Sequence, residues 1–214
     1  MEEYRETGGA YIGNGRATFP FAKLVVNKYK LELNVGILGN LIFRRSDIVS
    51  IQPNTGLSRG VKIDHRVSKY KDKVFFLPVG SVAETMEQIA KTGFLVNSEA
   101  IPIEIEQYIV TRQLSGGFPL KISATIAIVG IWNIFFLYDM RKTFTTGVPN
   151  FGIGIKMSLG FMLLICTLLL TNKRVQILIL KPGQDISNLK IMLYFILIIT
   201  IIMFVVFNFI PTHT

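Results

Sequence analysis

The stretch IMLYFILIITIIMFVVFNFI, residues Ile191–Ile210, sets the class of this chain, because it holds 20 consecutive residues without a charge. An α-helix rises about 1.5 Å per residue, so this run would be about 30 Å long, the thickness of a bilayer's hydrocarbon core. Two further apolar runs precede it, at Ile122–Tyr138 and Phe151–Thr171. The sequence therefore predicts three transmembrane α-helices and an integral membrane protein.

The second run contains one charge, Lys156. A lysine at the centre of a bilayer costs roughly 2.5–3.5 kcal/mol on insertion scales. Lys156 lies near one end of its run, so we expect its ammonium to reach the headgroups rather than to act as an intramembrane functional charge.

Charge is distributed unevenly along the 214 residues. Residues 1–117 hold 15 Lys or Arg and 12 Asp or Glu, whereas residues 118–214 hold 8 and 2. The excess positive charge thus flanks the apolar runs, where it anchors helices at an anionic leaflet, and no base-stacking motif points to nucleic acid. The acidic start, MEEYRETGGAYIGNG, has no apolar core, so we expect no secretory signal peptide.

Flanking positive residues also predict the orientation of the chain. With the N-terminus inside, the inner segments hold Arg112, Lys121, Lys173, Arg174, Lys181 and Lys190, against Arg141 and Lys142 outside. This count favours a cytoplasmic N-terminus and an external C-terminus.

The part before Gly117 has the pattern of a soluble β-rich module. Short apolar or alternating segments, separated by turn residues, occur at 22–26, 29–35, 41–43, 48–52, 61–67 and 74–77. A helix should follow, because Ser81 and Glu84 have capping-box spacing and Gly93 is a stop signal. The glycines of GGAYIGNG and GVPNFGIGIK we read as flexible connections.

This order of strands and helix resembles the pleckstrin-homology-like superfold in its short bacterial, GRAM-type form, as found in the heads of prokaryotic membrane proteins. The resemblance covers about residues 10–94 and rests on ATFPFAKLVVNKYKLELNVGILGNLIFRRSDIVSIQPNTGLSRGVKIDHRVSKYKDKVFFLPVGSVAETMEQIAKTGF. It implies a lipid- or protein-binding module, since such folds are seldom enzymes. Members that bind phosphoinositides carry a long basic loop between their first two strands. Here that connection is the tight Asn27-Lys28 turn, so inositol-lipid binding does not carry over.

The strongest candidate site is a basic hairpin that contains Arg59, Lys62, Arg66, Lys69, Lys71 and Lys73, against Asp64 and Asp72. Such a hairpin can rest on anionic headgroups, with about 1 kcal/mol for each cation near the surface. The alternative is a solvated hairpin whose charges only protect a sheet edge from aggregation.

Residues suited to catalysis or metal binding are sparse. His65 shares a face with Val61 and Ile63, which suggests a structural, half-buried histidine, and His213 is at the tail. Cys166 is the only cysteine, so no intrachain disulfide or cysteine-based metal site can form. No hydrolase, protease or nucleotide-binding motif is present, and we expect no cofactor.

Two segments are ambiguous. Ile101–Arg112 fits either a strand or a helix with Pro102 in its first turn, and Ser115–Gly117 reads as a linker. Val175–Leu180 is too short to cross a membrane. It fits a strand docked on the head or an extension of the second span that breaks at Pro182.

The sequence as a whole predicts an α+β protein in three parts. They are a cytoplasmic head at 1–96, an antiparallel sandwich or partly open barrel capped by one C-terminal helix; a connector at 97–117; and three spans at 118–214. We expect a non-enzymatic binding or scaffold module in a prokaryotic cell membrane. Its expected partners are the bilayer, anionic headgroups, and a protein or a second copy. The alternative is a regulatory or accessory subunit of a transport or channel assembly; a membrane enzyme is disfavoured.

Overall fold

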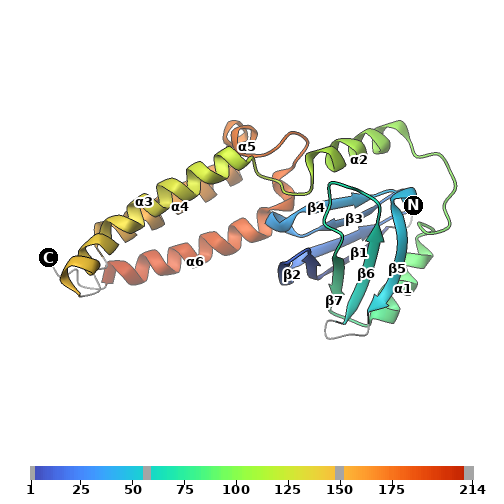
Figure 1. The fold of residues 1–214 in the computed structure, drawn as a ribbon, viewed down its shortest axis with the longest axis horizontal. Coiled ribbons are helices and arrows are strands. Elements are labelled where there is room, and N and C mark those ends of the chain that lie inside the picture. The colour runs from blue at the N-terminus through green and yellow to red at the C-terminus, as the bar shows by residue number, and fades with distance from the viewer. Residues whose placement is uncertain (1–2, 55–58, 148–151, 210–214) are drawn as a thin grey trace. The chain divides into compact units, whose positions relative to one another are not determined.

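The computed structural model describes residues 3–54, 59–147 and 152–209, with the side chains of Lys142 and Thr146 left out. The chain divides into two compact units. The sheet unit is Met1–Pro119 with Pro182–Asn188, and the helical unit is Leu120–Lys181 with Leu189–Thr214. Strands are confined to the first unit and the long apolar helices to the second, so the described chain is α+β, as predicted (Figure 1).

The sheet unit contains one antiparallel sheet of seven strands in the order β4-β3-β2-β1-β7-β6-β5. The strands are β1 Tyr4–Ile12, β2 Gly15–Val26, β3 Leu31–Asn34, β4 Asn40–Phe43, β5 Ile48–Asn54, β6 Gly60–His65 and β7 Val74–Pro78. Figure 1 shows that the sheet curls into a half-barrel, with β4 and β5 as its two edges. Short 3-10 turns at Gly36–Leu38 and Arg45–Asp47 lie before and after β4.

The first strand, β1, was not predicted from the sequence. The glycines of GGAYIGNG are not a flexible connection, because Gly8 and Gly9 lie inside β1, between β2 and β7. A Cβ on Gly8 would lie 2.3 Å from the carbonyl oxygen of Leu77, and one on Gly9 would lie 2.8 Å from that of Ala17. The neighbouring strands therefore approach β1 so closely that these positions require glycine. The first two strands are joined at Gly13-Asn14, and Asn27-Lys28 lies in the next turn.

The core of the unit lies on the concave side of the sheet. Inward residues alternate along the strands and include Leu24, Leu33, Val61 and Phe76, each with no exposed surface. Helix α1, Val82–Lys91, contacts β5, β6 and β7. It adds Ile89 to the same core cluster, with Val82 and Met86 packed beside it, and Phe94 folds back into that cluster.

The start of α1 differs from the prediction in its chemistry. Ser81 is the N-cap residue, but its side chain makes no capping hydrogen bond, so the capping box with Glu84 does not form. Ser81 instead contributes its carbonyl oxygen, which accepts from the Thr85 backbone N–H at 3.0 Å. The helix ends as expected before Gly93, whose φ of +73° is a left-handed conformation that glycine adopts without strain.

The ambiguous connector is a helix. Helix α2, Ile103–Ser115, contacts β4 and buries Ile109. Gln113 fixes it to the sheet, because its Nε2 donates to the carbonyl oxygen of Ile42 at 3.0 Å and to Asp47 Oδ2 at 2.7 Å. Arg44 adds an ion pair to Glu106 and a 3.2 Å hydrogen bond to Gln113. The strand alternative for this segment was wrong.

A distant segment, Pro182–Asn188, completes the sheet unit. The Arg112 guanidinium donates to Gln184 Oε1, and Gln184 donates in turn to Ser115 Oγ at 3.2 Å. Asn34 donates to Asn188 Oδ1 at 2.9 Å. Arg112 is only 3% exposed and stacks on the Tyr108 ring, while its Nε has no hydrogen-bond partner among the described residues.

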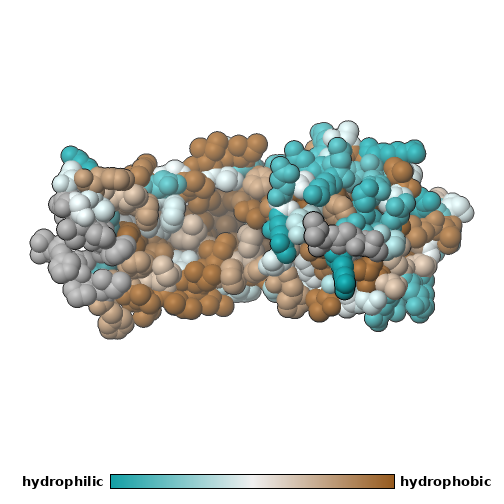
Figure 2. Space-filling model, turned by 60° about the horizontal axis from the view of Figure 1, so that its bottom comes forward, coloured by the Kyte–Doolittle hydropathy of each residue, from teal (hydrophilic) through white to brown (hydrophobic). Residues whose placement is uncertain are grey.

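The helical unit holds α3 Ile122–Thr146, α4 Ile153–Thr171, the short α5 Lys173–Ile179 and α6 Lys190–Phe209. Helices α3, α4 and α6 are each long and apolar enough to cross a membrane. Figure 2 shows the apolar colour gathered over this unit and the polar colour over the sheet unit. The predicted end positions Phe151 and Ile210 lie outside the described residues, as do four residues of GVPNFGIGIK, and the first span continues past its predicted end at Tyr138.

Residues Val175–Ile179 are helical rather than a strand docked on the head, and Leu180 forms an isolated antiparallel bridge with Leu120. Helix α5 is a separate helix because Asn172 has an extended backbone and its side chain accepts hydrogen bonds from the N–H groups of Arg174 and Val175. The break thus falls at Asn172, and not at Pro182. The end of α5 is held by Lys121, whose N–H donates to the Ile179 carbonyl oxygen at 2.8 Å.

Candidate functional site: a cationic surface on the sheet

The structure divides the six predicted basic residues between the two ends of β6. Arg59 precedes the strand, Lys62 lies within it, and Arg66 begins the loop after it. Six residues of strand span about 20 Å at 3.3 Å per residue, so Arg59 does not share a surface patch with Arg66 and the lysines that follow. The predicted hairpin is therefore two sites.

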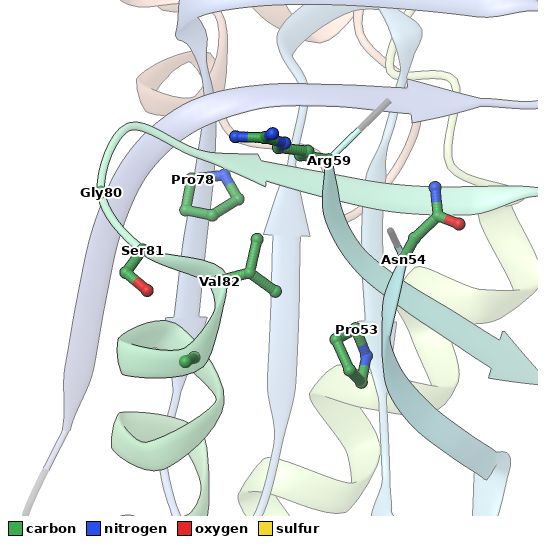
Figure 3. Close-up of a pocket in the computed structure, with 8 residues that line it drawn as sticks. Pro53, Asn54, Arg59, Pro78, Gly80, Ser81 and Val82 are labelled. Atoms are coloured by element: carbon green, nitrogen blue, oxygen red, sulfur yellow. The ribbon is translucent and has the colours of Figure 1, made fainter. Parts of the chain in front are cut away.

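At the Arg59 end there is a pocket of about 560 Å³ (Figure 3). It is lined by Pro53, Asn54, Arg59, Pro78, Gly80, Ser81, Val82 and Ala83. Figure 3 shows Val82 pointing between Pro53 and Pro78, while the Arg59 side chain extends toward Pro78. The pocket therefore combines an apolar floor with one guanidinium and the start of α1.

The polar groups that line the pocket are few. Arg59 is the one charged residue among its described lining residues, and Ser81 is its one hydroxyl-bearing residue. No histidine, carboxylate or amine among those lining residues stands beside Ser81 to remove its proton, so this set lacks the base that a serine nucleophile requires.

The other end of β6 carries the basic loop, which we define as Arg66–Lys73. Arg66, Lys69, Lys71 and Lys73 are all exposed in it, together with Asp72. Lys69 Nζ donates to the carbonyl oxygen of Leu114 at the end of α2, at 3.1 Å. Tyr70 is the loop's buried anchor: burial raises the pKa of its phenol to about 12, and the Ile42 backbone N–H donates to its Oη at 3.3 Å.

A row of side chains on the convex face of the sheet extends this basic surface. Arg16 pairs with Tyr11, Tyr11 with Phe75, and Phe75 with Lys62, so four adjacent strands contribute one residue each. Directly paired residues in an antiparallel sheet project from the same face. Lys73, two residues before Phe75, places its ammonium 6.0 Å from that ring, and the Arg16 guanidinium lies 5.3 Å from the Tyr11 ring. We call these residues the cation–aromatic row; they are Arg16, Tyr11, Phe75, Lys62 and Lys73.

The charges within the row are not equivalent. Lys62 Nζ lies 2.8 Å from Asp64 Oδ1, and this ammonium holds the pKa of the Asp64 carboxyl below its usual range, with further help from the Ser50 hydroxyl. Lys62 is thus largely neutralised by its neighbour. Arg16 and Lys73 are exposed and have aromatic rather than acidic neighbours, so they are the cations of the row that face solvent.

The sequence analysis missed Arg16, Tyr11 and Phe75. They are scattered over 60 residues of sequence, and only the register of β1 with its two neighbours brings them together. Because β1 was not predicted, this register could not be inferred. The one available signal was the alternation of Tyr11 and Arg16 with the buried Ile12 and Ala17.

His65 is partly buried on β6. Its ring packs against Phe43 with centroids 5.0 Å apart and the planes tilted by 34°, and its Nε2 lies 3.0 Å from the Lys71 carbonyl oxygen. Among the described residues no group of three or more His, Cys, Asp or Glu could hold a metal ion. Comparison of the chain with family models, with curated proteins and with solved structures finds no match.

Proposed function

We propose that this protein is a membrane-anchored binding module of pleckstrin-homology-like type. Its sheet unit binds the anionic headgroups of the leaflet on its own side of the membrane. Two structural features support the type. All seven strands are antiparallel to their sheet neighbours, and α1 follows β7 directly, which is the order on which the resemblance rests. The three long apolar helices fit a membrane protein and supply the anchor.

The observation that carries the proposal is the position of the basic loop beside the chain's exit from the sheet unit. Lys69 is bonded to Leu114, and the Asn40 N–H donates to the carbonyl oxygen of Gly117 at 3.0 Å. Only four residues separate Gly117 from the first residue of α3, Ile122. Extended chain spans at most about 3.6 Å per residue, so covalent connection alone keeps Gly117 within roughly 18 Å of the first span.

Electrostatics then favours contact with the leaflet. Four exposed cations, Arg66, Lys69, Lys71 and Lys73, face only Asp72 within the loop. Each contributes about 1 kcal/mol near an anionic surface, within a Debye length of about 8–10 Å at physiological ionic strength. In the orientation given by the flanking positive residues, this leaflet is the cytoplasmic one. Binding at this site requires only negatively charged headgroups and no chemical step, so the module we propose is non-enzymatic.

A label on the loop of the intact protein tests the proposal. Ser68→Cys in a Cys166→Ser background gives one thiol for a polarity-sensitive fluorophore. In nanodiscs with anionic lipid the emission should shift to the blue, and the shift should shrink with added salt and in zwitterionic lipid. Reversal of Arg66, Lys69, Lys71 and Lys73 to Glu should remove it. Identical emission in both lipids would show that the loop is simply solvated, as the alternative interpretation of the sequence holds.

A second candidate, an accessory subunit of a transport or channel assembly, is favoured by the exposure of α3. Only 6% of its most apolar window is buried within the chain, so the faces of α3 that do not pack on α4 are open to lipid or to another membrane protein. Crosslinking from Ile126 and Ile134, which are both 67% exposed, distinguishes the two candidates. Crosslinks to one transport protein in stoichiometric amount would favour the accessory subunit; crosslinks to lipid alone would favour the anchor.

A further inference from the structure

We infer that the cation–aromatic row on the convex face is a second contact site for the anionic headgroup layer, which adjoins the basic loop and shares Lys73 with it. This inference rests on the proposed function and adds residues that the loop does not contain. The row joins four strands through direct cross-strand pairs, from Arg16 through Tyr11 and Phe75 to Lys62. It is a rigid surface of the sheet and not a property of one loop.

The chemistry of the row matches a membrane interface. Tyrosine and phenylalanine have large apolar rings that are favourable at headgroup depth, and arginine and lysine on either side supply charge to lipid phosphates. Both solvent-facing cations lie over rings, with 5.3 Å between the Arg16 guanidinium and Tyr11 and 6.0 Å between the Lys73 ammonium and Phe75. An anion bound to either cation would therefore rest beside an aromatic surface.

The row also lies at the correct end of the sheet for the leaflet. The Gly13 N–H donates to the Lys73 carbonyl oxygen at 2.8 Å, so the β1–β2 turn adjoins the basic loop. A Cβ at Gly13 would lie 3.2 Å from the Lys71 side chain. The loop in turn adjoins Gly117, because the side chain of Tyr70 lies at that glycine. Gly117, the basic loop and the β1–β2 turn therefore adjoin one another in this order. Tyr11 and Arg16 lie beside that turn.

Tryptophans placed near the two ends of β7 test this inference in the intact protein. In a Trp132→Phe background, Phe75→Trp reports on the row. Val79→Trp, just past β7 at the pocket end and 68% exposed, is the matched control. In nanodiscs that contain anionic lipid and a lipid with a nitroxide on its headgroup, F75W emission should be quenched and V79W emission should not. Arg16→Glu, which leaves every residue of the basic loop in place, should reduce F75W quenching toward the V79W level, whereas Lys23→Glu, an exposed charge elsewhere on β2, should leave it unchanged.

The outcomes separate the two sites. If the Ser68 label senses anionic lipid while F75W is no more quenched than V79W, the loop contact stands and the row inference is overturned. If F75W is quenched and the Ser68 label is indifferent, the row is the contact and the loop proposal fails. If lipid does not quench F75W, but its emission changes when a single-stranded oligonucleotide is added, the row binds nucleic acid and the inference is overturned.

Discussion

The carboxylate of Asp139 in α3 accepts a hydrogen bond from the backbone N–H of Ile155 in α4, with 2.8 Å between Oδ2 and N. Asp139 is 2% exposed, and Gly152, which occupies the N-cap position of α4, has no side chain of its own for this purpose. Asp139 therefore replaces the missing cap from the neighbouring helix. A helix N-terminus is also electropositive, so this is a favourable place for a carboxylate.

Asp139→Ala should destabilise the α3–α4 hairpin by about 0.5–2 kcal/mol, the usual cost of a lost N-cap. We expect a lower midpoint of thermal unfolding for the full chain in detergent. Asn133→Ala is the control, because Asn133 is only partly buried on α3 and, among the described residues, its side-chain amide donates to the Val129 carbonyl oxygen of its own helix. Equal midpoints for the two variants would show that the cap contributes nothing.

Gly8→Ala should destabilise the sheet unit severely. Its new Cβ would lie 2.3 Å from the Leu77 carbonyl oxygen and 2.9 Å from the Phe76 ring, which forces β1 and β7 apart. Overpacking of this kind typically costs 1–3 kcal/mol or more. Gly80→Ala is the matched control, since the nearest atom to its Cβ would be Glu84 Oε2 at 3.8 Å. Limited proteolysis of the full chain measures the difference, and similar digestion rates would contradict the close approach.

Gln113→Ala should loosen α2 from the sheet. It removes three hydrogen bonds, to the Ile42 carbonyl oxygen, to Asp47 and from Arg44, although Arg44 and Asp47 keep the bonds that they make to each other. We expect a loss of about 1–3 kcal/mol, with faster amide exchange in α2. Gln107, exposed on the same helix, provides the control substitution. Unchanged exchange in α2 would mean that apolar contacts such as that of Ile109 hold the helix alone.

Alkaline titration should reveal Tyr70. Burial raises the pKa of its phenol from 10 to about 12, so the folded state favours the protonated form. The resulting stabilisation is complete below pH 10 and is lost as the pH rises through 12. Tyr70→Phe should reduce the alkaline loss of stability, and absorbance near 295 nm should show one fewer late-titrating tyrosine. Tyr4, whose pKa is also raised to about 12, will remain in both proteins. Unchanged titration would place Tyr70 in contact with solvent.

The orientation can be tested with single cysteines in a Cys166→Ser background. Ser187 lies in the segment between α5 and α6, and Thr145 lies at the end of α3; both are exposed. If the N-terminus is cytoplasmic, an impermeant maleimide on intact cells should label Thr145→Cys and spare Ser187→Cys. The reverse pattern would mean that the flanking positive residues give the wrong orientation.

Sequence reasoning succeeded where a single local property decides the structure. The charge-free run at Ile191–Ile210 and the Val/Met/Ile face of residues 82–89 both predicted helices that the structure contains. It failed at β1, because Gly8 and Gly9 carry no periodic signal and are explained by the close approach of two neighbouring strands, one of which, β7, lies about 70 residues away. Ser81 had the right spacing for a capping box, but spacing cannot fix a rotamer.

In the candidate site, too, the features set by local sequence were predicted and those set by distant parts of the chain were not. The charges of Arg66, Lys69, Lys71 and Lys73 are visible in the sequence, because they are close together in one loop. The separation of Arg59 from them depends on the length of β6, and the recruitment of Arg16 depends on strand register. Asp139 directly follows the predicted first span, Ile122–Tyr138. Its role depends on the approach of α4, which composition alone does not encode.

The docking of Pro182–Asn188 on the sheet unit has a consequence for biosynthesis. Arg112 is made 72 residues before its partner Gln184, and the segments that become α3 and α4 are translated in between. When the synthesis of α2 is complete, Gln184 has not yet been translated, so the Arg112 guanidinium lacks this hydrogen-bond acceptor. The sheet unit can therefore reach its final form only after α3 and α4 have been synthesised, so the maturation of this unit depends on the synthesis of two apolar helices.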